Sequence, residues 1–198
     1  MAFRCAAVTP ISVCSLGAAL FLAFGFTAGA RAAIVTLDAA QDTTLYETPD
    51  GGLGNGAGQH IFSGVNSVGR IRRALIAFDV AGGLPAGALI EDVSLSLHLS
   101  LTVAPPQPIT LHAVAASWGE GASVAAGQEG GGAPSQPGDA TWLHRFYPSV
   151  PWIQSGGDFS PVASASTVVA SEGAYAWSSP AMVSDVQLWV DEPGANAG

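Results

Sequence analysis

The sequence has no lysine, and its six basic residues are all arginines. Fifteen acidic residues oppose them, which gives a formal net charge of −9 at pH 7. A protein of this charge is repelled by phosphate backbones and by anionic lipid headgroups. The composition therefore argues against nucleic-acid binding and against binding to a membrane surface.

Cysteine is almost as scarce, because only Cys5 and Cys14 occur in the chain. Both lie in an N-terminal segment that has the three parts of a secretory signal. Arg4 supplies the charge, residues 11–26 form an almost wholly apolar run, and Ala30-Arg31-Ala32 has the small residues of a cleavage site. The apolar run is shorter than the roughly 20 residues that a membrane-spanning helix needs. We therefore predict a signal peptide over residues 1–32, cleaved after Ala32 or one residue later.

Cleavage would leave residues 33–198, a length that suits one domain. Four arginines would then face all fifteen acids, so the formal net charge would become −11. The processed chain would have no cysteine, no disulfide and no membrane span. Abundant Gly, Ala, Ser and Thr fit a secreted, extracellular β-protein.

Strand patterns dominate the remaining sequence. From Val93 to Val103 the odd positions are apolar and the even ones are Ser, His or Thr, which is the two-residue period of a half-buried strand. Residues 72–80 alternate similarly, with Ala74, Ile76, Phe78 and Val80 on one face, and Pro85 and Gly87 provide the turn between the two segments. We expect residues 109–115 to pair back on residues 93–103 as a hairpin.

Shorter segments complete the predicted fold. Strands are expected near residues 34–37, 42–46, 61–64, 164–170 and 174–177, and loops over 48–59 and 119–138. The second loop has no periodic apolar face, so it is either mobile or functional. One helix is predicted from the N-cap Ser179 and Pro180, with an apolar stripe of Met182, Val183, Val186, Trp189 and Val190. The pattern indicates an all-β antiparallel sandwich with one short C-terminal helix.

Several blocks together resemble the DNRLRE-domain proteins, a secreted bacterial family that overlaps carbohydrate-binding module family ninety-six. The resemblance implies a jelly-roll β-sandwich that is often linked to polysaccharide binding and lacks catalytic machinery. Members of the family continue past the helix into closing strands, so the end at Gly198 suggests a C-terminal truncation. The matching blocks are Asp42-Thr43-Thr44, Asn55-Gly56-Ala57-Gly58, 73–80, 84–93, 110–114, 117–121, 140–142, Trp152 with 156–159, and 186–189.

No catalytic motif is present in the chain. It lacks a Gly-x-Ser-x-Gly elbow and a His-Glu-x-x-His pair, and its glycine-rich loop lacks the Gly-Lys-Ser/Thr of a phosphate-binding loop. The acids are scattered through loops, and no spacing singles out a glycosidase pair. We expect a non-catalytic protein.

An aromatic segment over residues 141–152 is the strongest candidate for a ligand site. Sugars stack their C–H faces on aromatic rings and hydrogen-bond to polar side chains. The predicted polysaccharide-binding residues are Trp142, Arg145, Tyr147 and Trp152. The alternative is that Trp142 and Trp152 pack in the core, as we expect for Trp118 and Trp189, because large aromatics in small sandwiches are usually buried. The two interpretations are evenly balanced for Trp142 and Trp152.

Metal sites are less clearly indicated. Asp42, Asp79 and Asp158 adjoin turns and are candidate ligands for a structural calcium ion, although no Asp-x-Asp-x-Asp loop occurs and each is better explained as a solvated turn residue. In the expected hairpin, His98 and His112 would be diagonal neighbours on one outward face. No further zinc ligand falls in register, so we interpret them as surface histidines.

Together these features predict a secreted, non-catalytic β-sandwich module that binds a polysaccharide or cell-surface glycan. Two alternatives stay open. One is a structural or adhesive extracellular domain without glycan recognition. The other is an ancillary domain of a polysaccharide-degrading enzyme.

Overall fold

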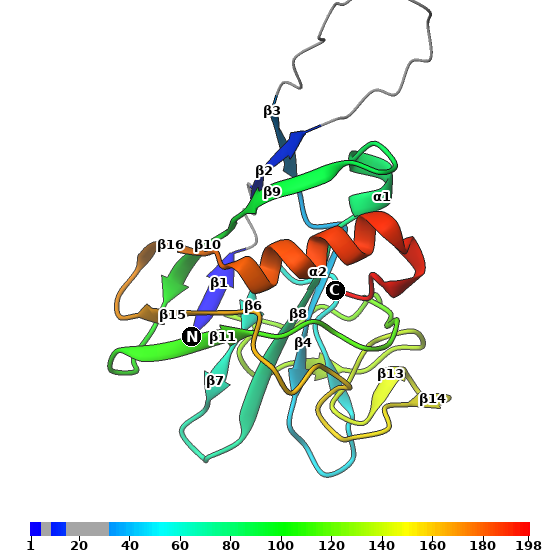
Figure 1. Ribbon diagram of the computed structural model, residues 1–198. Helices are drawn as coiled ribbons and strands as arrows, with labels where there is room; N and C mark the ends of the chain where they lie inside the picture. The colour runs from blue at the N-terminus through cyan, green and yellow to red at the C-terminus, as the bar shows by residue number, and fades with distance from the viewer. Residues whose placement is uncertain (5–8, 15–31) are drawn as a thin grey trace, which may run out of the picture.

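The computed structural model describes residues 1–4, 9–14 and 32–198 (Figure 1). The fold is an antiparallel all-β sandwich with one C-terminal helix, α2 (Pro180–Asp191), as the sequence predicted. A single turn, α1 (Val80–Gly83), and a 3-10 turn, η1 (Pro193–Ala195), are the other helical segments of the described residues. Neither α-helix in these residues has the length and apolar content that a membrane span requires.

Six antiparallel sheets, some of only two short strands, build the sandwich. Their strand orders are β16-β10-β1-β6, β4-β8-β7, β3-β2-β9, β11-β15, β12-β5 and β13-β14. The strands are β1 (Ala2–Arg4), β2 (Thr9–Cys14), β3 (Ala32–Leu37), β4 (Gln41–Tyr46), β5 (Leu53–Gly54), β6 (Ile61–Phe62), β7 (Gly64–Val65), β8 (Ile71–Ala77), β9 (Leu89–Val93), β10 (Leu95–Leu101), β11 (Gln107–Leu111), β12 (Ala133–Pro134), β13 (His144–Phe146), β14 (Val150–Pro151), β15 (Ala165–Val169) and β16 (Gly173–Trp177).

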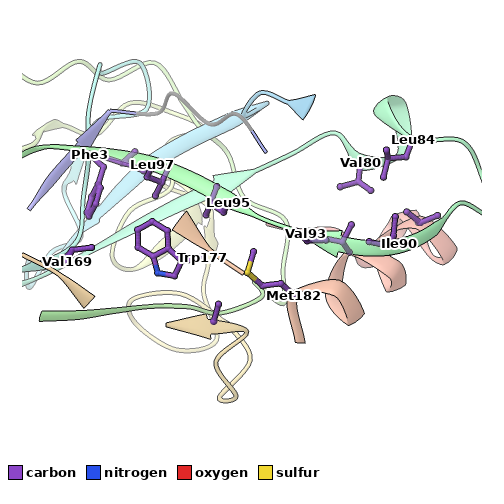
Figure 2. Packing of buried hydrophobic residues seen from close by; sticks show 14 of the residues in the cluster. Phe3, Val80, Leu84, Ile90, Val93, Leu95, Leu97, Val169, Trp177 and Met182 are labelled. Atoms are coloured by element: carbon purple, nitrogen blue, oxygen red, sulfur yellow. The ribbon is translucent and has the colours of Figure 1, made fainter. Parts of the chain in front are cut away.

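The main core lies on one face of β10 and under α2. Leu95, Leu97 and Leu99 of β10 are buried, which confirms the alternation expected for this strand. Figure 2 shows Trp177 between Phe3 and Met182; the rings of Phe3 and Trp177 meet edge to face with centroids 6.5 Å apart. The indole Nε1 of Trp177 donates a hydrogen bond to the carbonyl of Ile109 at 2.8 Å, so this large side chain is buried without losing its polar partner.

Helix α2 closes this core as its sequence predicted. The Ser179 hydroxyl accepts a hydrogen bond from the backbone N–H of Met182 at 3.1 Å, which caps the first turn. Met182, Val186 and Val190 are buried, and Val183 and Trp189 pack against the same cluster. The apolar stripe therefore faces the sheets.

The predicted hairpin between residues 93–103 and 109–115 is wrong. Strand β10 pairs with β1 and β16, while β11 pairs with β15, with Ile109 opposite Thr167. Two consecutive prolines, Pro105 and Pro106, stand where a tight hairpin would turn, and Pro108 within β11 has no N–H to donate. Alternation specified which face of each strand is buried, but it carries no information about the partner strand.

Part of the predicted signal peptide contributes strands to the sheets. Strand β1 pairs with β10 and β6, and Phe3 is 1% exposed in the main core. Strand β2 pairs with β3 and β9. Residues 5–8 and 15–31 of the predicted signal peptide lie outside the described residues. Cleavage after Ala32 stays a prediction, and it would remove both β1 and β2 from the sheets.

Leu99 provides a test of the core. Its side chain is fully buried in β10, so Leu99→Ala is expected to lower the free energy of unfolding by about 2–5 kcal/mol through lost burial and a residual cavity. Urea unfolding followed by circular dichroism measures the change. Leu101→Ala, two positions further along the same strand and 42% exposed, is the matched control and should cost less than about 1 kcal/mol. Equal losses for both variants would contradict the assigned core face.

Candidate functional site

A second apolar cluster holds the loops around β13 and β14. Its buried members include Trp118, Trp142 and Trp152, together with Leu45 and Leu75 from β4 and β8. Trp142 is 8% exposed and Trp152 is 5% exposed, and the Trp152 indole donates to the carbonyl of Thr141 at 2.9 Å. These two tryptophans therefore pack in the core, and neither offers an open ring to a ligand.

Arg145 and Tyr147 behave differently, because both are partly exposed at the surface of the same loops. Nη1 of Arg145 donates hydrogen bonds to the carbonyl and to the hydroxyl of Ser117, at 3.0 and 3.1 Å. The Tyr147 ring packs edge-on against His144, with centroids 5.4 Å apart. The structure therefore keeps two of the four predicted ligand residues in contact with solvent.

The backbone around these two residues is tightly held. Gly119 N–H donates to the carbonyl of Arg145 at 2.9 Å, and Gly138 N–H donates to the carbonyl of Tyr147 at 2.8 Å. Tyr147 N–H in turn donates to the carbonyl of Asp139 at 2.8 Å. The guanidinium is thus presented from strand β13 and the phenol ring from the turn that follows it, on a backbone held by hydrogen bonds.

The glycine-rich loop over residues 119–138 is organised by two buried carboxylates. Glu129, 7% exposed, accepts hydrogen bonds from the backbone N–H of His60 at 2.9 Å and from Nδ2 of Asn55 at 3.1 Å, among others. Asp139, fully buried, accepts from the N–H groups of Ala122 at 3.0 Å and Gln136 at 2.7 Å. Sequence reasoning missed both residues, because an acid in a polar loop gives no sign that it will be buried.

Hydrogen bonding shifts the acidity of Glu129. Burial alone would raise the pKa of this carboxyl, but the bonds from Gln59, Asn55 and His60 favour the ionised form and lower the pKa below its usual value. His60 Nδ1 also lies 3.3 Å from the carboxylate. Glu129 therefore serves as an ionised anchor that joins the long loop to residues 55–60.

The three candidate calcium ligands lie in separate parts of the fold. The Asp79 carboxylate caps α1 by accepting from Gly82 N–H at 2.8 Å, and Asp158 accepts from the N–H groups of Ile153 and Gln154 at 3.0 and 2.8 Å. Asp42 lies in β4, where its backbone N–H donates to Glu120. Within the described residues no group of three or more His, Cys, Asp or Glu could hold a metal ion. The structure does not bring the three together, and calcium stays a prediction.

The two histidines considered as metal ligands lie in different places, His98 in β10 and His112 just after β11. His98 in β10 lies opposite Ala174 of β16. The His112 ring meets Phe159 at 5.4 Å, and its Nδ1 lies 2.9 Å from the carbonyl of Ser160. Their expected diagonal arrangement depended on the incorrect hairpin and does not occur.

A large cavity of about 580 Å³ lies between the sheets. Strands β8, β10 and β11 and helix α2 contribute about half of its lining, which is largely apolar, and Arg73, His112 and Asp185 are among its polar members. The cavity is partly open to solvent, so water or another occupant can enter it. No pattern in the sequence indicated this space.

Comparisons with protein-family models, curated proteins and solved structures give no match. The resemblance to DNRLRE-domain proteins therefore stays a prediction.

Glu129 provides a test of how the loop is held. Glu129→Gln is expected to lower the free energy of unfolding at pH 7 by about 1–3 kcal/mol, because an amide places its NH₂ group against buried N–H donors. The folded-state pKa lies below the unfolded value near 4.3, so the stabilisation is present above that pH and disappears as the pH falls through the folded pKa.

Urea unfolding at pH 7 and near pH 3 measures this difference. The difference in the free energy of unfolding between the wild type and Glu129→Gln should be smaller at the lower pH. Glu172→Gln, at an exposed position, is the control and should change stability little at either pH. A gap that is the same at both pH values would show that Glu129 is not stabilising the fold as a carboxylate.

Proposed function

We propose that this protein is a non-catalytic β-sandwich module that binds a polysaccharide through Arg145 and Tyr147. The observation that supports it is the pairing of a partly exposed phenol ring with a tethered guanidinium two residues away, on a backbone held by hydrogen bonds. The other two predicted ligand residues, Trp142 and Trp152, support the site from beneath by packing.

The chemistry of the pair suits a sugar. A pyranose ring can lay its C–H face on the Tyr147 ring, which lies nearly perpendicular to the His144 ring. Arg145 uses Nη1 to bond Ser117, which leaves its remaining N–H groups to donate to sugar hydroxyls. The tether matters because a side chain already held in place loses less entropy when a ligand binds.

Secretion belongs to the same proposal. The N-terminal signal sequence would send the processed module out of the cell, where polysaccharides are available as ligands. The processed module would then bind polysaccharide at a bacterial surface or in the extracellular space, either alone or as the ancillary part of a polysaccharide-degrading enzyme.

A second candidate is a structural or adhesive domain without glycan recognition. It is favoured by the burial of Trp118, Trp142 and Trp152 in one cluster, since the aromatic residues that most often form sugar platforms are here used for packing. The two candidates differ in whether Tyr147 contacts a ligand.

Titration calorimetry against a panel of neutral and acidic polysaccharides tests the proposal. We expect saturable binding to at least one of them, about a tenfold loss of affinity in Tyr147→Ala or Arg145→Ala, and retention in Tyr147→Phe, which keeps the ring. Val168→Ala, which is on β15 and 61% exposed, is the control and should bind like the wild type. Absence of heat with every polysaccharide, from protein that still melts cooperatively, would favour the structural candidate.

A further inference from the structure

The cavity between the sheets runs along the edges of strands. It is lined by the consecutive residues 73–76 of β8 and by the consecutive residues 108–114 in and after β11. Successive side chains of a strand point to opposite faces, so a space against one face would be lined by every second residue. The two unbroken runs indicate that the main chain of both strands, as well as their side chains, borders this space.

Both edges lack a partner strand in the part of the chain that the structure describes. Strand β4 pairs with β8 along one side, from Gln41 opposite Ala77 to Tyr46 opposite Arg72. On the other side β7 pairs with only Arg72 and Ile71, so residues 73–77 have no hydrogen-bonded strand there, although β6 contacts β8. Strand β11 pairs with β15 alone. An unpaired edge presents N–H and C=O groups in the geometry that a further strand would use.

The position of Gly198 gives the width of this space. Its carbonyl accepts a hydrogen bond from Val114 N–H at 2.6 Å, just after β11. A Cβ at Gly198 would lie 2.7 Å from the carbonyl oxygen of Ile76, in β8. One backbone therefore reaches both borders at this end of the cavity, which is the separation expected when a single strand lies between two others.

Charge adds a chemical requirement for the occupant. The Arg73 guanidinium lines the cavity, lies 4.9 Å from the Phe159 ring centroid, and donates to the carbonyl of Gly156. No carboxylate among the described residues lies within ion-pair distance of it, although acids outnumber arginines fifteen to six in the sequence. A carboxylate on an incoming segment would complement this cation.

We propose that the space bordered by residues 73–77 and 107–114, which we call the edge slot, binds an extended segment of a partner polypeptide. The segment adds as a β-strand between β8 and β11, buries alternate apolar side chains between the layers, and places an acidic side chain against Arg73. The same fold already holds a short strand in this way, since β1 lies between β10 and β6 and buries Phe3. Arg145 and Tyr147 do not line the edge slot, so this site is independent of the proposed glycan site.

A synthetic peptide tests the proposal with the full chain. The probe is a fluorescent octapeptide in which valine alternates with threonine and one glutamate, and its binding is followed by anisotropy. We expect saturable binding, together with slower amide exchange in Ala74–Ala77 and Gln107–Leu111. The same peptide with alternate amides N-methylated cannot pair along both edges, and it should bind at least about tenfold more weakly.

Two variants locate the bound peptide. Ala74→Phe places a large ring in the cavity and should abolish binding, whereas Ala81→Phe, at an exposed position of α1, should not. Arg73→Gln should weaken the glutamate peptide by about tenfold and leave a glutamine version unchanged. The comparison of the glutamate and glutamine peptides on Arg73→Gln tests whether the peptide binds beside Arg73, even if Ala74→Phe impairs folding.

Three outcomes would overturn the proposal. The first is the absence of saturable binding to cooperatively folded protein. The second is equal affinity for the normal and the N-methylated peptide, which would mean that the strand edges are not used. The third is tight binding of dodecanoate with no peptide binding, which would make the cavity a site for an apolar anion instead.

Discussion

Burial of one face of β10 against Trp177 and α2 is the constraint on which the rest of the structure depends. Leu95, Leu97 and Leu99 cannot be covered by their own sheet, so a second layer and a helix must pack over them. Trp177 is fully buried in the main core and is tied to β11 through the carbonyl of Ile109. This one contact links β16 to β11, two strands that are far apart in the sequence and belong to different sheets.

Strand β8 connects that core to the loops that carry the candidate glycan site. Ala74 and Ile76 on one side pack against the main cluster, whereas Leu75 on the other side belongs to the cluster of Trp118, Trp142 and Trp152. Because both faces of the strand are covered, β13 and β14 are anchored to the sandwich on the flank away from β2 and β3 (Figure 1). Tyr147 and Arg145 are therefore presented on a rigid support.

The two proposed sites use different parts of the same architecture. The glycan site relies on side chains that project from a hydrogen-bonded loop, and the edge slot relies on backbone groups that no strand covers. A module with both could hold a polysaccharide on one flank while a partner polypeptide completes its sheets. Arg73 lies between the two regions, since its guanidinium stacks on Trp142 and the residue also lines the cavity.

The sequence by itself determined the buried face of β10, the position of α2 and the all-β class, because period-two alternation and an N-cap are local properties of the chain. It did not reveal that both faces of β8 are covered, since Leu75 lies on the face that alternation marked as polar. Only the tertiary structure decided that β11 pairs with β15, because alternation marks the buried face of a strand and does not specify its partner strand. It alone decided that Trp142 and Trp152 are buried while Tyr147 is partly exposed, because a loop aromatic carries no periodic signal. The same holds for Glu129 and Asp139, whose burial depends on N–H donors that are supplied largely by loop segments brought together only by folding.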